Sequence, residues 1–412
     1  MAIDDAGIEK TERKATLTVG QRFVVTIEKI AHGGHFIARH LGAVIFVRHA
    51  IPGEEVEIEI TGTGSSFNRA DVVNVLKPSS DRVIAPCQFA HRSGCGGCDF
   101  QHISLSRQRE LKAQVIAEQF ARIAKKDLSI EVEEVGPALG YRTRFSAVTS
   151  RDGALGFRQA RSNKVVPVSD CRILQPEINY QELSDRKWKG DLQIEVAFSS
   201  KSERTIAIGN LRDESTVRTT EGPDVANYTV HDFHLEVSQR SFWQSHKEAP
   251  RVLTEAVQIY AAIEAGDHVL DLYGGVGLFT SQLVSLVTDR GRIDLIEGSK
   301  SATADALRNF KNFKNVDVHT GDVAKVLPRF SKVDVIVLDP PREGAGKSVV
   351  ASMVSLKPRA IVYVACDPAA LARDTGYLEA SGYELSQIRA FDLFPMTQHI
   401  ESVALFQPVK VS

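Results

Sequence analysis

Residues 360–374 read AIVYVACDPAALARD, an apolar, β-branched run followed by a turn and a helix-like segment. The run at 361–364 predicts a buried strand that ends by placing Cys366 at the edge of a sheet. Open α/β sheets bind their ligands at the carboxyl ends of strands. A thiol at such an edge is a nucleophile if its surroundings lower its pKa, and is otherwise a small buried hydrophobic side chain. Taken alone, the stretch favours the second interpretation.

Length and composition indicate an ordinary soluble protein. The chain has 412 residues, which is enough for two or three domains, with 43% hydrophobic and 25% charged residues. Its formal net charge of −2 excludes a molecule that is basic overall, so any nucleic-acid site must be a local patch. The N-terminal residues 1–14 are polar, predict a disordered tail and lack a signal-peptide core. We therefore expect a cytoplasmic protein without a membrane span.

Two regions precede the stretch quoted above. Residues 15–78 contain five short strand-like runs separated by turns such as Pro52-Gly53, which predicts a small OB-type barrel. Such barrels often bind oligonucleotides, although a purely structural barrel has the same pattern. Residues 79–237 contain a cysteine-rich loop, an amphipathic helix at 104–125 and further strands. We expect this range to be a mixed α/β central domain.

Residues 238–412 alternate helical stretches with short apolar strands, which predicts a parallel, doubly wound α/β sheet. The last two strands, YELSQIRAFDLFP and SVALFQP, are only a loop apart. This spacing favours a closing antiparallel hairpin, which is a feature of class I methyltransferases and not of dehydrogenase Rossmann folds.

A glycine-rich turn, DLYGGVGLFT at 271–280, follows one of these strands and precedes a helix. It lacks the G-x-G-x-x-G spacing of a pyrophosphate site. Glu297 ends the next strand, where an acid binds ribose hydroxyls, and Asp322 ends a further strand. Three such strand ends in order suit adenosine with an amino-acid tail, as in S-adenosylmethionine (SAM). Each acid taken alone would be a surface carboxylate or a helix cap.

The sequence VLDPPREG at 337–344 places Asp339 after an apolar strand and before two stiffening prolines. Amino-group methyltransferases have an aromatic residue where this chain has Arg342. The exchange argues against transfer to an exocyclic amine.

Cys366 has a possible catalytic partner in Glu401. Methylation of C5 of a pyrimidine needs a thiolate that adds to C6, which makes C5 nucleophilic, and a base that removes the C5 proton. Glu401, at the start of the last strand, is the candidate base. Read alone, it would be a salt-bridged acid at a strand edge.

The remaining cysteines have the spacing C-x₇-C-x₂-C-x₇₂-C. Three clustered cysteines and one distant cysteine fit a four-cysteine iron–sulfur cluster, with zinc as the second choice. The four are Cys87, Cys95, Cys98 and Cys171, so Cys366 is left over as the reactive thiol. Nearby, residues 142–164 carry six basic side chains against one acid, interleaved with Phe145 and Phe157. This segment is either an RNA-positioning patch or a solvated face.

Together these motifs resemble the uracil-C5 RNA methyltransferases, the family of the tRNA and 23S ribosomal RNA 5-methyluridine enzymes. Residues 25–40 and 43–60 resemble a TRAM domain, an OB-like RNA-binding module. The resemblance implies a [4Fe-4S] cluster on the four cysteines named above. It assigns SAM contacts to Gln244, Tyr273, Glu297 and Asp322, with Asp339 beside the methyl donor and the target base. It makes Cys366 the nucleophile and Glu401 the base.

The chain departs from the family pattern at two positions beside Cys366. The family usually has Ser-Cys-Asn-Pro where this sequence has Ala365-Cys366-Asp367-Pro368. The barrel and the cysteine cluster are nevertheless similar to those of the ribosomal RNA branch. We therefore expect a monomeric, SAM-dependent enzyme that forms 5-methyluridine in structured RNA, foremost 23S rRNA, and does not act on DNA. The alternatives are a tRNA enzyme and a non-catalytic RNA-binding iron–sulfur protein.

Overall fold

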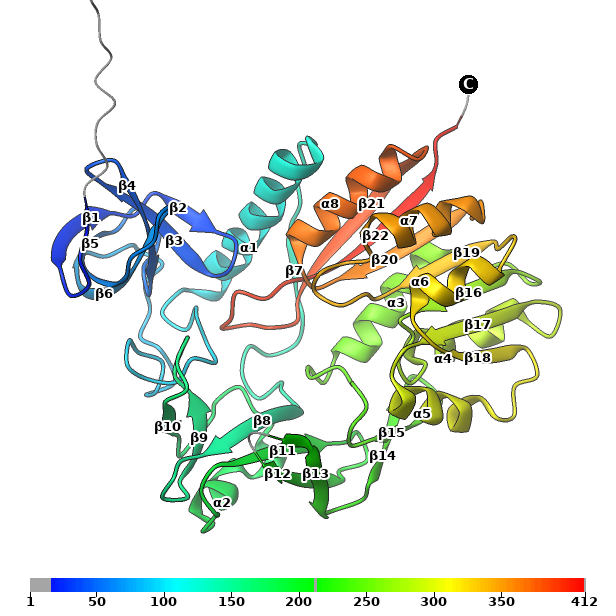
Figure 1. Ribbon diagram of the computed structural model, residues 1–412, viewed down its shortest axis with the longest axis horizontal. Helices are drawn as coiled ribbons and strands as arrows, with labels where there is room; N and C mark the ends of the chain where they lie inside the picture. Colours follow the sequence, from blue (N-terminus) through cyan, green and yellow to red (C-terminus); the bar gives the residue numbers. More distant parts are fainter. Residues whose placement is uncertain (1–15, 211–212, 411–412) are drawn as a thin grey trace, which may run out of the picture.

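A computed structural model describes residues 16–210 and 213–410 of the chain. Figure 1 shows an N-terminal barrel, a central sheet below it, and a C-terminal sheet flanked by helices. The tail expected at 1–14 lies outside the described residues. No helix within the described residues is both long and apolar enough to cross a membrane.

The N-terminal barrel is an antiparallel sheet with one parallel pair, β4 with β6, and strand order β1-β5-β6-β4-β3-β2. Alternate side chains of β4 and β5 are fully buried, as expected for strands with one face against a core. The first run expected from the sequence is split into two strands at Ile27 and Glu28. The strands are β1 (Arg22–Thr26), β2 (Lys29–Ala31), β3 (His35–His40), β4 (Ala43–Arg48), β5 (Glu55–Gly62) and β6 (Asn68–Lys77).

The central region forms a separate antiparallel sheet, in the order β10-β9-β8-β11-β12-β13. A hairpin of β14 and β15 follows it and leads toward the C-terminal sheet (Figure 1). The strands are β8 (Arg144–Thr149), β9 (Leu155–Arg158), β10 (Val165–Pro167), β11 (Leu192–Phe198), β12 (Arg204–Asn210), β13 (Asp213–Glu221), β14 (Val225–Val230) and β15 (Phe233–Ser238). A 3₁₀ turn at Pro176–Ile178 and helix α2 (Tyr180–Asp185) lie between β10 and β11.

The C-terminal sheet has the order β18-β17-β16-β19-β20-β22-β21-β7. Strands β16 to β20 are parallel, and β22 inserts antiparallel between β20 and β21. The closing hairpin expected from the sequence is therefore present. The strands are β16 (His268–Leu272), β17 (Arg292–Glu297), β18 (Val316–Thr320), β19 (Val335–Leu338), β20 (Ala360–Ala365), β21 (Tyr383–Asp392) and β22 (Glu401–Pro408).

Helices connect and cover these strands, as a parallel sheet that is buried on both faces requires. Strand β20 is buried along its whole length, which agrees with its unbroken apolar sequence. The helices are α3 (Ala249–Ala261), α4 (Leu278–Val287), α5 (Lys300–Phe310), α6 (Val323–Val326) with a 3₁₀ turn at Leu327–Arg329, α7 (Gly346–Ser355) and α8 (Pro368–Glu379).

Two elements from the range expected to be the central domain pack on the C-terminal sheet instead. Strand β7 (Val132–Glu134) pairs in parallel with β21 and extends the sheet. Helix α1 (Leu105–Gln119) continues into a π-helical turn (Phe120–Ala124) and lies between the barrel and the C-terminal sheet (Figure 1). The chain therefore enters the C-terminal fold twice, once before and once after the central sheet.

Candidate active site

Cys366 and Glu401 leave neighbouring antiparallel strands at the same level. The pairing of β20 with β22 ends at Ala365 opposite Ser402, so the next residues in register are Cys366 and Glu401. Side chains that lie directly opposite each other in an antiparallel pair extend on the same face of the sheet. Glu401 is buried, with 5% of its surface exposed, and Cys366 is partly exposed. The sheet thus brings together the thiol and the carboxyl that sequence reasoning paired.

The electrostatics of this pair favour the protonated forms. Desolvation, and then the Glu401 carboxyl, raise the pKa of Cys366 to about 12. Burial, and then Asp339, raise the pKa of Glu401 well above its usual range. Arg342 acts in the opposite direction on both groups. A positively charged ligand placed here would favour the thiolate and the carboxylate, because it would offset the repulsion between the negative charges.

Asp339 stands at the end of β19, next to the strand that carries Cys366. Desolvation and the nearby Asp271 raise its pKa to about 7. The loop that follows is fixed from α8, because Asp374 Oδ2 accepts hydrogen bonds from Ala345 N at 2.8 Å and from Tyr363 Oη at 2.8 Å. The helix that follows Cys366 therefore also holds the loop that presents Arg342.

The glycine-rich turn between β16 and α4 is packed tightly against its neighbours. Gly277 has a φ of +95°, and a Cβ there would lie 2.1 Å from the Phe310 ring. A Cβ on Gly274 would lie 2.6 Å from Leu295 Cγ. Close packing against β17 and α5 therefore requires glycine at both positions, whether or not a ligand also binds near this turn.

Asp271, the penultimate residue of β16, is hydrogen-bonded to the start of α4. Its Oδ2 accepts from Thr280 N at 3.1 Å and from Thr280 Oγ1 at 2.6 Å. Its Oδ1 is buried and lacks a hydrogen-bond partner among the described residues. Buried polar atoms are nearly always paired, so this oxygen is a free acceptor for a bound ligand.

Three of the predicted SAM contacts gather at one edge of the sheet. Tyr273 follows β16, Glu297 ends β17 and Asp322 follows β18, and these strands are adjacent. Glu297 accepts from Gly275 N at 3.0 Å and from Ser299 N at 2.6 Å, which fixes its carboxylate against the glycine-rich turn. Asp322 is exposed at the start of α6. This arrangement suits an extended ligand that crosses three strand ends.

The fourth predicted contact, Gln244, lies elsewhere. It is buried and lines a cavity of about 310 Å³ between the β14–β15 hairpin, the central sheet and α3. Tyr273, Glu297 and Asp322 do not line that cavity. The assignment of Gln244 to the SAM site stays a prediction.

A second cavity, of about 170 Å³, surrounds the Cys366 thiol. The barrel, the segment around α1 and the C-terminal fold line it. The lining residues are Ile30, His32, Gly33 and Gly34 from the barrel, Phe100, Lys112 and Val115 from the segment around α1, and Arg342, Cys366, Asp367, Pro368, Gln398, His399 and Ile400 from the C-terminal fold. The contribution of the barrel to this cavity was not predicted, because docking between domains leaves no periodic pattern in a sequence.

Helix α1 supports the segment that leads to Glu401. Lys112, only 1% exposed, donates to Asp392 Oδ1 at 2.6 Å and to Phe394 O at 3.0 Å. Gln108 accepts from Met396 N at 2.9 Å. Sequence reasoning identified the apolar face of this helix but missed its buried polar residues, which in sequence look like ordinary surface residues.

The four remaining cysteines lie near one another. Desolvation, and then neighbouring cysteines, raise the pKa of Cys98 and that of Cys171 to about 12. Gly97 N donates to Cys95 Sγ at 3.4 Å, as expected for a tight C-x₂-C turn. Within the described ranges, no group of three or more His, Cys, Asp or Glu side chains is arranged to hold a metal ion.

The basic segment 142–164 is divided between structural and exposed residues. Arg144 donates to Ser241 O and Gln239 O, both at 3.0 Å, and thereby joins the central sheet to the loop before α3. Phe145 and Phe157 pack within the core of the central sheet, so they are not free to stack on bases. The basic side chains that remain exposed are Arg151, Arg158, Arg161 and Lys164.

Comparisons with known proteins agree with this architecture. A family model described as TRAM domain matches residues 16–73, and one described as tRNA (Uracil-5-)-methyltransferase matches residues 292–409. A model described as Protein-L-isoaspartate(D-aspartate) O-methyltransferase matches residues 224–348, across the glycine-rich turn. Barrel and C-terminal fold thus match the two modules expected from the sequence.

Relatives cover almost the whole chain. An uncharacterized RNA methyltransferase of Streptomyces avermitilis is 40% identical over 432 residues, covering 95% of this chain and 99% of that protein. The 23S rRNA (uracil(1939)-C(5))-methyltransferase RlmD of Shewanella amazonensis is 30% identical over 434 residues, covering 95% and 97%.

A solved structure has the same fold. The tRNA (uracil-54, C5)-methyltransferase of Pyrococcus abyssi, in complex with S-adenosyl-L-homocysteine, superimposes with a TM-score of 0.71 at 22% identity. The match covers 93% of this chain and 99% of that one.

Proposed function

The chain belongs to the family of SAM-dependent RNA uracil-C5 methyltransferases, and on that premise we propose that it forms 5-methyluridine in 23S rRNA through a covalent adduct with Cys366. The observation that carries the proposal is the position of Cys366 directly opposite Glu401, beside Asp339. RNA as the substrate means that the enzyme works where ribosomal RNA is made, which we expect to be the cytoplasm.

In the proposed reaction, Cys366 and Glu401 act in different steps. Uracil C5 is a weak nucleophile until the Cys366 thiolate adds to C6, which pushes electrons onto the ring and gives C5 enolate character. C5 attacks the electrophilic methyl group that SAM would supply, the bond between that methyl group and sulfur breaks, and S-adenosylhomocysteine leaves. Glu401 then removes the C5 proton, the C5–C6 double bond re-forms, and the bond between Cys366 and C6 breaks. The carboxylate ends with the proton and the thiolate is regenerated.

The target base must leave its stack to reach this chemistry, because both faces of the C5–C6 bond are covered inside a helix. The cavity of about 170 Å³ at Cys366 is the site we assign to the flipped uracil. Arg342 lines this cavity and can orient the ring, while Asp339 lies near enough to Cys366 to raise its pKa. The exposed Arg158 and Arg161 can contact phosphates.

RNA from a strain that lacks the gene tests the substrate. Nucleoside mass spectrometry, mapped by position, is expected to show one 5-methyluridine missing from 23S rRNA, and its return with the wild-type gene but not with Cys366→Ala. A missing methyl group in tRNA would instead support the alternative suggested by the tRNA enzyme of similar fold. An unchanged set of RNA nucleosides, together with no SAM binding in a calorimetric titration, would support a non-catalytic protein.

We also infer that Cys87, Cys95, Cys98 and Cys171 hold a [4Fe-4S] cluster, with zinc as the second choice. The donor set fits: four soft thiols lie near one another, and each is partly shielded from solvent. Protein purified without oxygen is expected to show a visible charge-transfer band and to contain iron and sulfide. A colourless protein that contains zinc would support the second choice.

A further inference from the structure

The barrel makes a direct contact with the residue that follows Cys366. His32 Nε2 lies 3.0 Å from Asp367 Oδ2, across the boundary between the barrel and the C-terminal fold. The other oxygen of the same carboxylate accepts from Ala369 N and Ala370 N, both at 2.9 Å, and thereby caps α8. Asp367 is therefore held on one side by the helix and on the other by the barrel.

The ionisation of Asp367 determines which side chain donates the hydrogen bond. An ionised carboxylate only accepts hydrogen bonds, so His32 must donate through Nε2. Although desolvation acts in the other direction, the hydrogen bond from His32 and those from the helix hold the pKa of Asp367 below its usual range. An asparagine at 367 would still accept from the helix, but it would turn an N–H donor toward His32.

The loop that carries His32 also touches the segment before Glu401. Gly34 has a φ of +75°, and a Cβ there would lie 2.7 Å from both Cβ and Cγ of Gln398. The 32–34 loop thus contacts the turn after Cys366 and the segment that leads to Glu401, and it lines the cavity between them.

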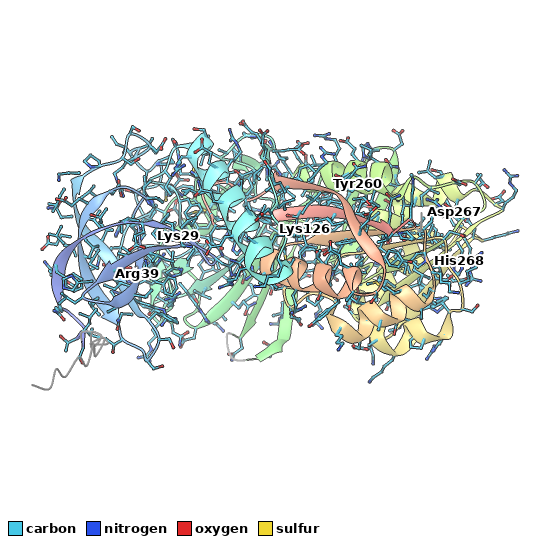
Figure 2. The ribbon with its side chains drawn as sticks, turned by 90° about the horizontal axis from the view of Figure 1, so that it is seen from above. Lys29, Arg39, Lys126, Tyr260, Asp267 and His268 are labelled. Carbon is cyan, nitrogen blue, oxygen red and sulfur yellow. The ribbon has the colours of Figure 1, made fainter. Side chains whose placement is uncertain are left out.

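The seating of the barrel does not depend on His32 alone. Lys29 Nζ pairs with Glu118 of α1 at 2.8 Å, and Arg161 of the central region donates to His35 Nε2 at 2.8 Å. Figure 2 shows Lys29 on the barrel side of α1, with Tyr260, Asp267 and His268 of the C-terminal fold on the far side. Loss of the His32 side chain should therefore loosen one contact without releasing the barrel.

We propose that the TRAM barrel is a working part of the methyl-transfer site: its 32–34 loop forms one wall of the uracil pocket, and His32 positions Cys366 through Asp367. The proposal rests on the proposed role of Cys366 as nucleophile. His32 is a positioning residue, because it acts on the thiol through the residue beside it. The barrel would thereby position bound RNA so that the target base lies next to the Cys366 thiol.

The test is single-turnover methylation, by the full-length protein, of 23S rRNA isolated from the deletion strain. His32→Ala is expected to slow methyl transfer about ten- to a hundredfold, because a small misplacement of a reacting group has an effect of that size. The KM for SAM should stay unchanged, since the SAM contacts lie at other strand ends. His32→Gln, which keeps an N–H donor for Asp367, should recover most of the rate.

The control is Glu118→Gln, which removes a different ion pair between the barrel and α1 and should leave the rate at the wild-type value. His32→Ala at the wild-type rate would overturn the proposal, as would equal losses in His32→Ala and His32→Gln, or in His32→Ala and Glu118→Gln. Cys366→Ala distinguishes failure of the proposed function from failure of the proposed role of His32. If that variant methylates RNA, the proposed function fails; if only the His32 variants behave like the wild type, the inference alone fails.

Discussion

Cys366 and Glu401 occupy directly opposite positions at the open end of the β20–β22 pair, one step beyond Ala365 and Ser402. Backbone pairing holds the proposed nucleophile and the proposed base at this spacing, so they cannot separate without breaking the sheet. The same position withholds water from both groups and so raises the pKa of each. If the proposed mechanism holds, a positively charged methyl donor beside the pair would lower both pKa values and so favour the thiolate and the carboxylate.

Replacement of the thiol tests the nucleophile. Cys366→Ala should reduce methyl transfer by at least about 10³-fold, because the step that activates C5 is lost. SAM affinity, measured by calorimetry, should be unchanged, because Cys366 is not among the predicted SAM contacts, three of which lie at the ends of β16, β17 and β18. Methylation of RNA at a normal rate by this variant would exclude the adduct mechanism.

Replacement of the base should arrest the reaction at a later step. In Glu401→Gln, thiol addition and methyl transfer can occur, but C5 then carries both a methyl group and a proton that no side chain removes. A covalent complex of protein and RNA should accumulate and survive a denaturing gel, with the RNA attached to the Cys366 peptide in mass spectrometry. The double variant Cys366→Ala/Glu401→Gln should form no such complex. Normal turnover by Glu401→Gln would identify a different base.

Local sequence patterns were sufficient to predict most of the fold. The alternation of apolar strands and helices predicted the C-terminal sheet, and the short spacing of its last two strands predicted the β21–β22 hairpin. The position of β7 could not be predicted, because a three-residue strand has no signal of its own and pairs with β21 only through tertiary contacts. Helix α1 was predicted as an element, but its packing on the C-terminal sheet also depends on tertiary contacts that no local pattern reveals.

The positions of the candidate site residues were predictable where these residues stand at the ends of strands. Cys366, Asp339 and Glu297 each follow or end an apolar run, and the sheet brings those ends to one edge. The contribution of His32 was not predictable, since a histidine in a glycine-rich turn has no local mark of a distant partner. Its contact also gives a physical reason for an aspartate at 367, where the family usually has asparagine.

The effect of Arg342 on the pKa of Cys366 can be tested by measuring how fast the thiol is alkylated. With a pKa of about 12, Cys366 should be almost wholly protonated at pH 8, and iodoacetamide should alkylate it roughly 10³-fold more slowly than a free cysteine. The rate should rise about tenfold for each pH unit, because the thiolate is the reactive form. Arg342→Gln should slow alkylation further, since Arg342 lowers this pKa, whereas Arg342→Lys should not. Faster alkylation in Arg342→Gln would contradict this account.

Asp294, in the middle of β17, offers a test of stability against pH. Its buried carboxylate accepts from His268 Nε2 and His319 Nε2, both at 2.7 Å, and pairs with Arg292 at 2.6 Å. Although desolvation opposes them, these contacts lower the pKa of Asp294 below its usual value. A carboxyl group whose pKa falls on folding stabilises the protein above its unfolded pKa of about 3.9, and that contribution is lost as the pH falls through the folded pKa.

Asp294→Asn should therefore lower the free energy of unfolding at pH 7 by about 2–4 kcal/mol, because it leaves the partners of a buried carboxylate uncompensated. The difference from the wild type should shrink below about pH 4, because there the unfolded wild-type chain takes up a proton at this carboxylate before the folded protein does. Urea unfolding followed by circular dichroism at several pH values measures both effects. Asp289→Asn, at an exposed position in the turn before β17, is the matched control and should change stability by less than about 0.5 kcal/mol. A constant difference between Asp294→Asn and the wild type across this pH range would show that packing, and not the carboxylate charge, sets the contribution of Asp294.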